Sequence, residues 1–492
     1  MTSLLAGRIR GASLIASLLV PMLVLPLSPA AAAPLQLGAA DTVWMLLMTM
    51  LVLLMAVAGL ALFYSGLVRA KNAIATLTQV FTVFCVAAVV WFACGYSVAF
   101  SSSSWVSFFG GFGKAFLISV KPGSIAATHT LGAGLPEYVH FAFQMMLAGL
   151  APALIVGAFA ERMRFQAVVL FAVLWSAFVY VPITHMMWFA PGPDAIADAA
   201  RAIQLAAPGA ARRQAEIALA ALQADAGLFA QWGAIDFAGG LVVHASAGIA
   251  GLIGALVVGQ RGGYGRETMA PHNLAMMLMG GALLWIGLIG LNAGAALGAN
   301  NAAALAVINS LLAAVGGAVA WIAIEIGSEQ QPSLIGVVSG MLAGLVAVAA
   351  GAGYVAPVAA FALGLVAAPV CYWACTYLKH TYQYDDSLDV FGIHCVGGVL
   401  GMLAVGVLAS PDLGGAGIAS FALRPGEAVI APFDIAGQMR AQVTALAVAL
   451  CWSSYVSYRL FKLVDSLVGL RPSPEDEARG LDIVDHGERV YN

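Results

Sequence analysis

Apolar residues run through most of the chain in blocks of about twenty, and short polar segments separate these blocks. A block of about 20 apolar residues is long enough to cross the hydrocarbon core of a bilayer as a helix. The pattern therefore predicts an all-α polytopic membrane protein with eleven transmembrane helices. The predicted ranges are 42–66, 76–100, 138–160, 166–189, 236–258, 273–292, 301–325, 334–351, 355–378, 389–409 and 437–464.

Three segments depart from this pattern: the N-terminal residues 1–33, an insertion at about 192–231 and the C-terminal residues 465–492. Residues 1–33 combine two arginines, an apolar stretch and a small-x-small site, which predicts a cleaved secretory signal peptide. Residues 42–464 form the predicted transmembrane domain, with an extracytoplasmic insertion at about 192–231 whose alanine-rich centre is typical of a helix. Residues 465–492 are polar and form a predicted tail, in which Gly480 and Gly487 permit sharp turns.

Basic residues predict the orientation of the chain in the bilayer. Arg69 and Lys71 follow the first helix, and short loops rich in Lys and Arg face the cytoplasm. Further basic residues lie in the short loops 161–165, 260–268 and 378–386, which the count of helices places on the same side. The mature N-terminus is then expected outside the membrane, and eleven crossings place the C-terminus in the cytoplasm.

Two of the apolar blocks repeat a polar pattern. DFAGGLVVHASAGIAG, from Asp236, and DVFGIHCVGGVLG, from Asp389, each hold a histidine, His244 or His394, with glycines four and seven residues after it. Such positions share one face of a helix, where glycine lets two backbones approach closely. The repeat predicts that helices 1–5 and 6–10 are inverted repeats whose histidines meet in one place, and that helix 11 is peripheral.

Composition excludes several classes of protein. Hydrophobic residues make up 62% and charged residues 9% of the chain, which excludes a soluble enzyme. The net charge of −3 shows no footprint of nucleic-acid binding. All six cysteines fall inside apolar segments without a CxxC spacing, so neither a disulfide framework nor a zinc site is expected. We expect no enzymatic activity, no cofactor and no nucleic-acid partner.

The chemistry of the polar residues leaves alternatives open. Buried histidines could ligate a metal, relay a proton or make structural hydrogen bonds, and metal is disfavoured because no third ligand accompanies the pair. Ionisable groups at membrane depth are costly, so they indicate a function by default. Asp236 begins its helix and could either cap it or attract cations, and the two roles are compatible.

Several segments resemble the ammonium transporter family (Amt/Mep/Rh), and in particular its bacterial Amt branch. They are LFYSGLVRAKN, GAFAERMRF, DFAGGLVVH, DDSLDVFGIH and GLDIVDHGERVYN, and the resemblance runs from about residue 42 to the C-terminus. It implies a homotrimer in the lipid bilayer of the bacterial inner (plasma) membrane, with one mostly hydrophobic pore per subunit. It also implies His244 and His394 as the pore pair, Asp236 as an acid near the outer mouth and Trp188 as a wall of the outer vestibule.

The resemblance implies transport of ammonium, with methylammonium as a related substrate. Carrying a cation through a dry pore costs of order 20 kcal/mol before compensation. Deprotonating an amine of lysine-like pKa at pH 7 costs only about 4–5 kcal/mol, which favours passage of neutral ammonia. Whether the proton also crosses stays open. So do two alternatives: an ammonium sensor or receptor with little conduction, and an Rh-like gas channel of relaxed selectivity.

The sequence also departs from the family pattern. Leu147 and Leu291 stand where most members of the bacterial branch stack two phenylalanines as an outer gate, and Ala295 replaces a serine. Each lost ring removes a cation–π attraction of about 0.5–2 kcal/mol. We therefore expect a looser aliphatic gate and weaker capture of ammonium. The tail 465–492 resembles the segment that receives a PII signalling protein in family transporters.

Overall fold

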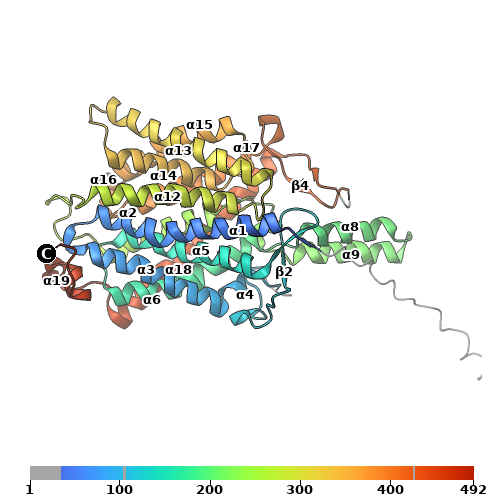
Figure 1. Cartoon of the computed structure of the whole chain (residues 1–492), viewed down its shortest axis with the longest axis horizontal. Coiled ribbons are helices and arrows are strands. Elements are labelled where there is room, and N and C mark those ends of the chain that lie inside the picture. Colours follow the sequence, from blue (N-terminus) through green and yellow to red (C-terminus); the bar gives the residue numbers. More distant parts are fainter. Residues whose placement is uncertain (1–34, 103–106, 425–426, 492) are drawn as a thin grey trace, which may run out of the picture. The chain divides into compact units, whose positions relative to one another are not determined.

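The computed structural model describes residues 35–102, 107–424 and 427–491, so the predicted signal peptide lies outside the described residues. Most of the described chain is helical (Figure 1). Several long helices are interrupted by a π-helical or 3₁₀ turn, labelled η. The long helices are α1–η1–α2 (Ala39–Leu67), η2–α3–η3–α4 (Ala70–Ala99), α5–η5 (Glu137–Phe159), α6–η6–α7 (Phe165–Trp188), η7–α11 (Gly240–Val258), α12 (Leu274–Gly294), α13 (Asn301–Gly327), α14 (Leu334–Ala349), α15–η8–α16 (Pro357–Tyr382), η9–α17 (Phe391–Leu408) and α18 (Ile435–Val468).

These helices make the chain a multi-pass membrane protein. Each predicted segment holds a helix, and nine helices within the described residues are long and apolar enough to cross a bilayer. The two others differ in length or polarity: α14 has 16 residues, and α18 has 34 residues that include charged side chains such as Arg440 and Arg459. The count of eleven membrane crossings therefore stays a prediction.

Short elements complete the fold. The insertion contains α8 (Pro193–Leu205), α9 (Ala210–Ala224) and α10 (Leu228–Gln231), which confirms a helix in its alanine-rich centre. Figure 1 shows α8 and α9 side by side beyond the ends of the long helices. Within the described residues five short strands add to the predicted all-α fold, because strands of two to four residues leave no periodic signal. They are β1 (Gln36–Leu37), parallel to β3 (Ala133–Pro136), which is antiparallel to β2 (Ile125–Ala127), and the antiparallel pair β4 (Ala419–Ser420) and β5 (Val429–Ile430).

Glycines bring several helices into backbone contact. α13 packs against both α14 and α15. A Cβ at Gly317 of α13 would overlap the carbonyl of Gly340 on α14, and a Cβ at Gly364 of α15 would overlap the carbonyl of Ala313 on α13. Close approach at small residues is how helices gain van der Waals contact where lipid removes the hydrophobic driving force.

A buried network of charges joins the three short basic loops. Arg261 donates to Glu161 at 2.9 Å and to Asp385 at 2.8 Å, and Arg69 donates to Glu161 at 3.1 Å. Burial acts to raise the pKa of the Glu161 carboxyl, but Arg261 and Arg69 outweigh it and lower that pKa below its ordinary value. Loops 161–165, 260–268 and 378–386 therefore lie on the same side of the protein, as the sequence predicts.

The C-terminal tail packs against these loops and the start of α3 (Ala73–Val90). Leu481 is buried and its N–H donates to the Asn72 side chain at 2.9 Å, while the Asp482 carboxylate accepts from the Ala75 N–H at 2.8 Å. Lys71 donates to the carbonyl of Ala478 at 2.7 Å, at the end of α19 (Pro474–Arg479; Figure 1). The predicted turns are present, because φ is 104° at Gly480 and 69° at Gly487.

Candidate functional site

Two histidines from distant parts of the chain meet inside the apolar core. His244 lies in the π-helical turn η7 (Gly240–Ala245) and His394 lies in η9 (Phe391–Cys395). Their Nδ1 atoms are 3.2 Å apart, and their rings are nearly parallel, with centroids 5.2 Å apart and planes 8° apart. Both side chains are buried, with exposed fractions of 1% and 7%. The structure thus brings together the two imidazoles that the repeated sequence pattern pairs.

Glycine and the π-helical turns place the two rings. A Cβ at Gly248 would overlap the backbone nitrogen of Cys395, and a Cβ at Gly398 would overlap the carbonyl of Gly240. The two histidine-bearing helices therefore approach through the glycine that lies four residues after each histidine, as predicted. π-helical turns are rare and occur frequently at functional sites, and sequence periodicity does not reveal them.

The short distance between the Nδ1 atoms sets the tautomers of the pair. One Nδ1 must carry the proton and donate it, and the other must accept. In two neutral rings the donor ring then has a bare Nε2 and the acceptor ring has an Nε2–H. The Nε2 of His244 has no hydrogen-bond partner among the described residues. The pair can therefore offer one acceptor and one donor to a small molecule that is both.

Asp236 caps the start of the first histidine helix. Its carboxylate accepts from the N–H groups of Gly239 at 3.1 Å, Leu241 at 2.9 Å and Val242 at 2.9 Å. The helix begins at Gly240, so the predicted start at 236 is wrong: residues 236–239 are not helical, which lets the Asp236 carboxylate reach forward to the N–H groups of the first turn. Trp188 donates from Nε1 to the Asp236 carbonyl at 2.7 Å and so lies beside this cap.

The partner of Asp236 in the repeat is Asp386, and the pairing of Asp236 with Asp389 is wrong. Asp386 accepts from the Phe391 N–H at 2.7 Å, five residues on, as Asp236 accepts from Leu241. Asp389 instead accepts from Lys379 at 2.8 Å and has a φ of 58°. Spacing could have shown this, because each capping aspartate lies eight residues before its histidine.

A cavity of about 340 Å³ lies beside Asp236, and we call it the entrance cavity. Its lining includes Phe143, Leu147, Trp188, Asp236 and Ala295, and also the polar side chains of His140, Gln144 and Gln438. The structure thus gathers Trp188, Asp236 and Leu147 around one space. His140 and Gln144 carry no motif that singles them out in the sequence. Only their position on the same helix as Leu147 could have indicated them.

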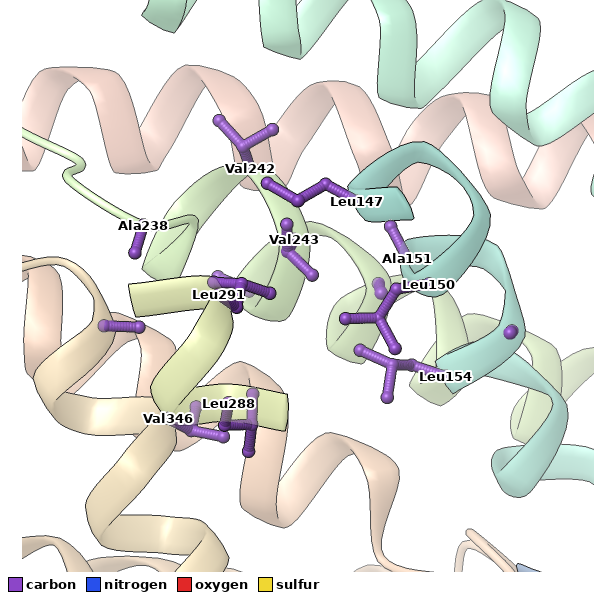
Figure 2. Packing of buried hydrophobic residues seen from close by; sticks show 14 of the residues in the cluster. Leu147, Leu150, Ala151, Leu154, Ala238, Val242, Val243, Leu288, Leu291 and Val346 are labelled. Carbon is purple, nitrogen blue, oxygen red and sulfur yellow. The ribbon is translucent and has the colours of Figure 1, made fainter. Parts of the chain in front are cut away.

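The two leucines at the predicted gate positions are buried in the apolar core. Leu147 belongs to α5 (Glu137–Ile155) and is 1% exposed, and Leu291 belongs to α12 and is 0% exposed. Figure 2 shows both side chains in one cluster with Val242 and Val243, which directly precede His244. Leu147 lines the entrance cavity, whereas Leu291 is not among the residues that line it.

These features together define a class of protein. Apolar helices that are long enough to cross a bilayer, a cavity and a buried pair of polar rings are features of a membrane transporter or channel for a small solute. Within the described residues no group of three His, Cys, Asp or Glu side chains could hold a metal ion.

Comparison with known proteins identifies the family. A model of the Ammonium Transporter Family matches residues 43–491. The ammonium transporter of Bacillus subtilis is 36% identical over 92% of this chain and 98% of its own length, and that of Aquifex aeolicus is 36% identical over 93% and 94%. The crystal structure of Candida albicans Mep2 covers 89% of this chain and 88% of its own, with a TM-score of 0.72 and 27% identity. The chain belongs to the Ammonium Transporter Family, and its relatives are named transporters rather than enzymes.

The cap at Asp236 generates a prediction about stability. In Asp236→Asn one of the two acceptor oxygens becomes an NH₂ donor, so at least one of the three backbone N–H groups loses its partner. We expect a loss of about 1–3 kcal/mol, measured as a lower Tm of the purified protein in detergent. Asp434 caps the exposed start of α18, where asparagine caps equally well, so Asp434→Asn is the matched control. Equal Tm values for the two variants would contradict this role for Asp236.

Proposed function

We propose that this chain transports ammonium through a pore that passes from the entrance cavity, between Leu147 and Leu291, to His244 and His394. The observation that carries the proposal is the buried contact between the two imidazoles, whose Nδ1 atoms are 3.2 Å apart. Ammonium loses its proton near the entrance cavity, and ammonia passes the aliphatic layer. The acceptor and donor Nε2 atoms then match ammonia, which has both a lone pair and N–H groups.

The apolar layer explains why the proton must leave. Leu147, Leu291 and Val243 offer no polar atom to a cation, and the penalty for a bare ion in such surroundings is of order 20 kcal/mol. Removing the proton at pH 7 costs about 4–5 kcal/mol. The proton then either returns to the entrance side or follows a path that includes the imidazoles.

The proposed architecture extends beyond the nine apolar helices. α14 and α18 cross the membrane as well, which gives eleven crossings, an N-terminus outside and a C-terminus in the cytoplasm of a bacterium. The matching caps of Asp236 and Asp386, each eight residues before a histidine, support inverted repeats of helices 1–5 and 6–10. α18 packs against α6, α11 and α17 on the outside of these repeats. Three copies form a homotrimer, with one pore in each subunit.

Uptake by the purified protein in proteoliposomes tests the function. We expect saturable uptake of radiolabelled methylammonium that ammonium inhibits. Binding of ammonium without uptake would support the sensor alternative, and rapid uptake that does not saturate would support the gas channel. A current that accompanies uptake would show that charge crosses, whereas uptake without current would show passage of neutral ammonia.

The paired histidines generate the first prediction on transport. His244→Ala or His394→Ala leaves the remaining imidazole without its partner and removes a polar contact for ammonia. We expect the rate to fall about five- to a hundredfold, because leaving a buried donor or acceptor without its partner costs about 1–3 kcal/mol. His380 is exposed on α16 (Lys379–Tyr382), so His380→Ala is the matched control. Unaltered transport in both pore variants would defeat the assignment.

The aliphatic gate generates a second prediction. Leu147→Phe together with Leu291→Phe adds two rings whose faces attract a cation by about 0.5–2 kcal/mol each. We expect the half-saturating concentration of ammonium to fall at least about fivefold, since two rings together contribute about 1–4 kcal/mol, and the discrimination against methylammonium to increase. Leu413 is an exposed leucine outside this cluster, and Leu413→Phe serves as the control. If neither property changes in the double variant, the leucines do not weaken capture.

The tail generates a third prediction. We propose that residues 465–492 hold the cytoplasmic loops in place and receive a trimeric PII signalling protein that blocks the pore when nitrogen is plentiful. The contacts of Leu481, Asp482 and Lys71 support an ordered tail. Truncation after Gly469 should lower the transport rate severalfold and abolish PII binding in a pull-down. A truncated protein that keeps both properties would show that the tail has neither role.

A further inference from the structure

A chain of buried polar groups leads to the wall of the entrance cavity. Lys114 pairs with Glu137 at 2.6 Å between Nζ and Oε1, and the Tyr96 hydroxyl donates to the same Oε1 at 3.1 Å. The Tyr96 oxygen also lies 3.2 Å from Nδ1 of His140. Glu137, Tyr96 and His140 are at most 6% exposed. These groups therefore make a continuous series of hydrogen bonds that ends at an imidazole on the cavity wall.

The direction of these bonds fixes the tautomer of His140. The Glu137 carboxylate beside Lys114 can only accept, so the single proton of the Tyr96 hydroxyl is committed to it. The Tyr96 oxygen must then accept from His140, which requires the proton of a neutral ring on Nδ1. The other ring nitrogen, Nε2, is left with a lone pair, and no described residue makes a hydrogen bond to it.

Aromatic neighbours hold the His140 ring in place, in addition to the hydrogen bond that fixes its proton on Nδ1. The Phe100 ring meets the His140 ring edge to face, with centroids 4.8 Å apart, and the Tyr96 ring lies 5.8 Å away. His140 shares the lining of the entrance cavity with Trp188 and Phe143. The fixed lone pair on Nε2 and the rings of Trp188 and Phe143 together suit a small cation that donates hydrogen bonds.

We propose that His140 Nε2 is a hydrogen-bond acceptor that recognises ammonium in the entrance cavity, and that Lys114, Glu137 and Tyr96 orient it. The inference deepens the proposed function and rests on it. Ala295 lines the same cavity and carries no hydroxyl that could accept a hydrogen bond. An amine cation with at least one N–H, such as ammonium or methylammonium, fits this acceptor, whereas a cation without N–H groups does not.

The test compares two substitutions of His140 in proteoliposomes with ammonium as the substrate. Glutamine places an oxygen near the position of Nε2, while leucine has a similar size and no acceptor. We expect His140→Leu to raise the half-saturating concentration about tenfold, and His140→Gln to stay within about threefold of the wild-type protein. Tyr96→Phe should also raise it, because the Nδ1 proton is no longer held in place, whereas Tyr138→Phe removes a hydroxyl that bonds the Val120 carbonyl and should not.

Each outcome decides the matter. Equal half-saturating concentrations in the wild-type, leucine and glutamine proteins would overturn the inference, and so would equal losses in both variants, which would show a structural role only. A wild-type protein that does not transport ammonium would instead refute the proposed function, so the two failures are distinguishable.

Discussion

The contact between His244 and His394 is the constraint on which the rest of the structure depends. Two imidazoles can lie 3.2 Å apart at Nδ1 only if their backbones come close, and the glycines after each histidine permit this approach. Asp236 and Asp386 cap the starts of the same two helices, each eight residues before the histidine. The caps therefore fix where each helix begins relative to its histidine. Both rings are buried, and the short distance between their Nδ1 atoms sets their tautomers.

Much of this arrangement can be predicted from sequence, and the reasons are physical. Blocks of about twenty apolar residues identify the long helices because lipid demands both length and internal hydrogen bonding. The spacing of histidine and glycine predicts the meeting of His244 and His394 because it places them on one helix face. The apolar run around 334–351 illustrates the limit, since its helix has only 16 residues and length alone does not decide whether it crosses.

Other parts of the site depend on contacts that sequence patterns do not contain. The π-helical turns at both histidines leave no periodic signature in the sequence. The sequence pairs Asp389 with Asp236 because both begin similar segments, but Asp389 bonds to Lys379 and does not cap its helix as Asp236 does. In the sequence, nothing distinguishes His140 from any other single histidine on an apolar helix. Only its contact with Tyr96, which lies 44 residues earlier in the chain, singles it out. The tail gains its order from bonds to residues about 400 positions away, such as that between Leu481 and Asn72, which are 409 apart.

The central claim is that ammonium loses its proton before it passes the aliphatic layer, and a comparison of ammonium with potassium tests it most directly. Potassium has a similar size and the same charge but has no proton to lose. We predict that proteoliposomes containing the wild-type protein take up ammonium in a saturable manner and show no potassium uptake or current above that of empty liposomes. Potassium transport at a rate comparable with that of ammonium would contradict the account, because an intact cation would then cross the layer formed by Leu147, Leu291 and Val243.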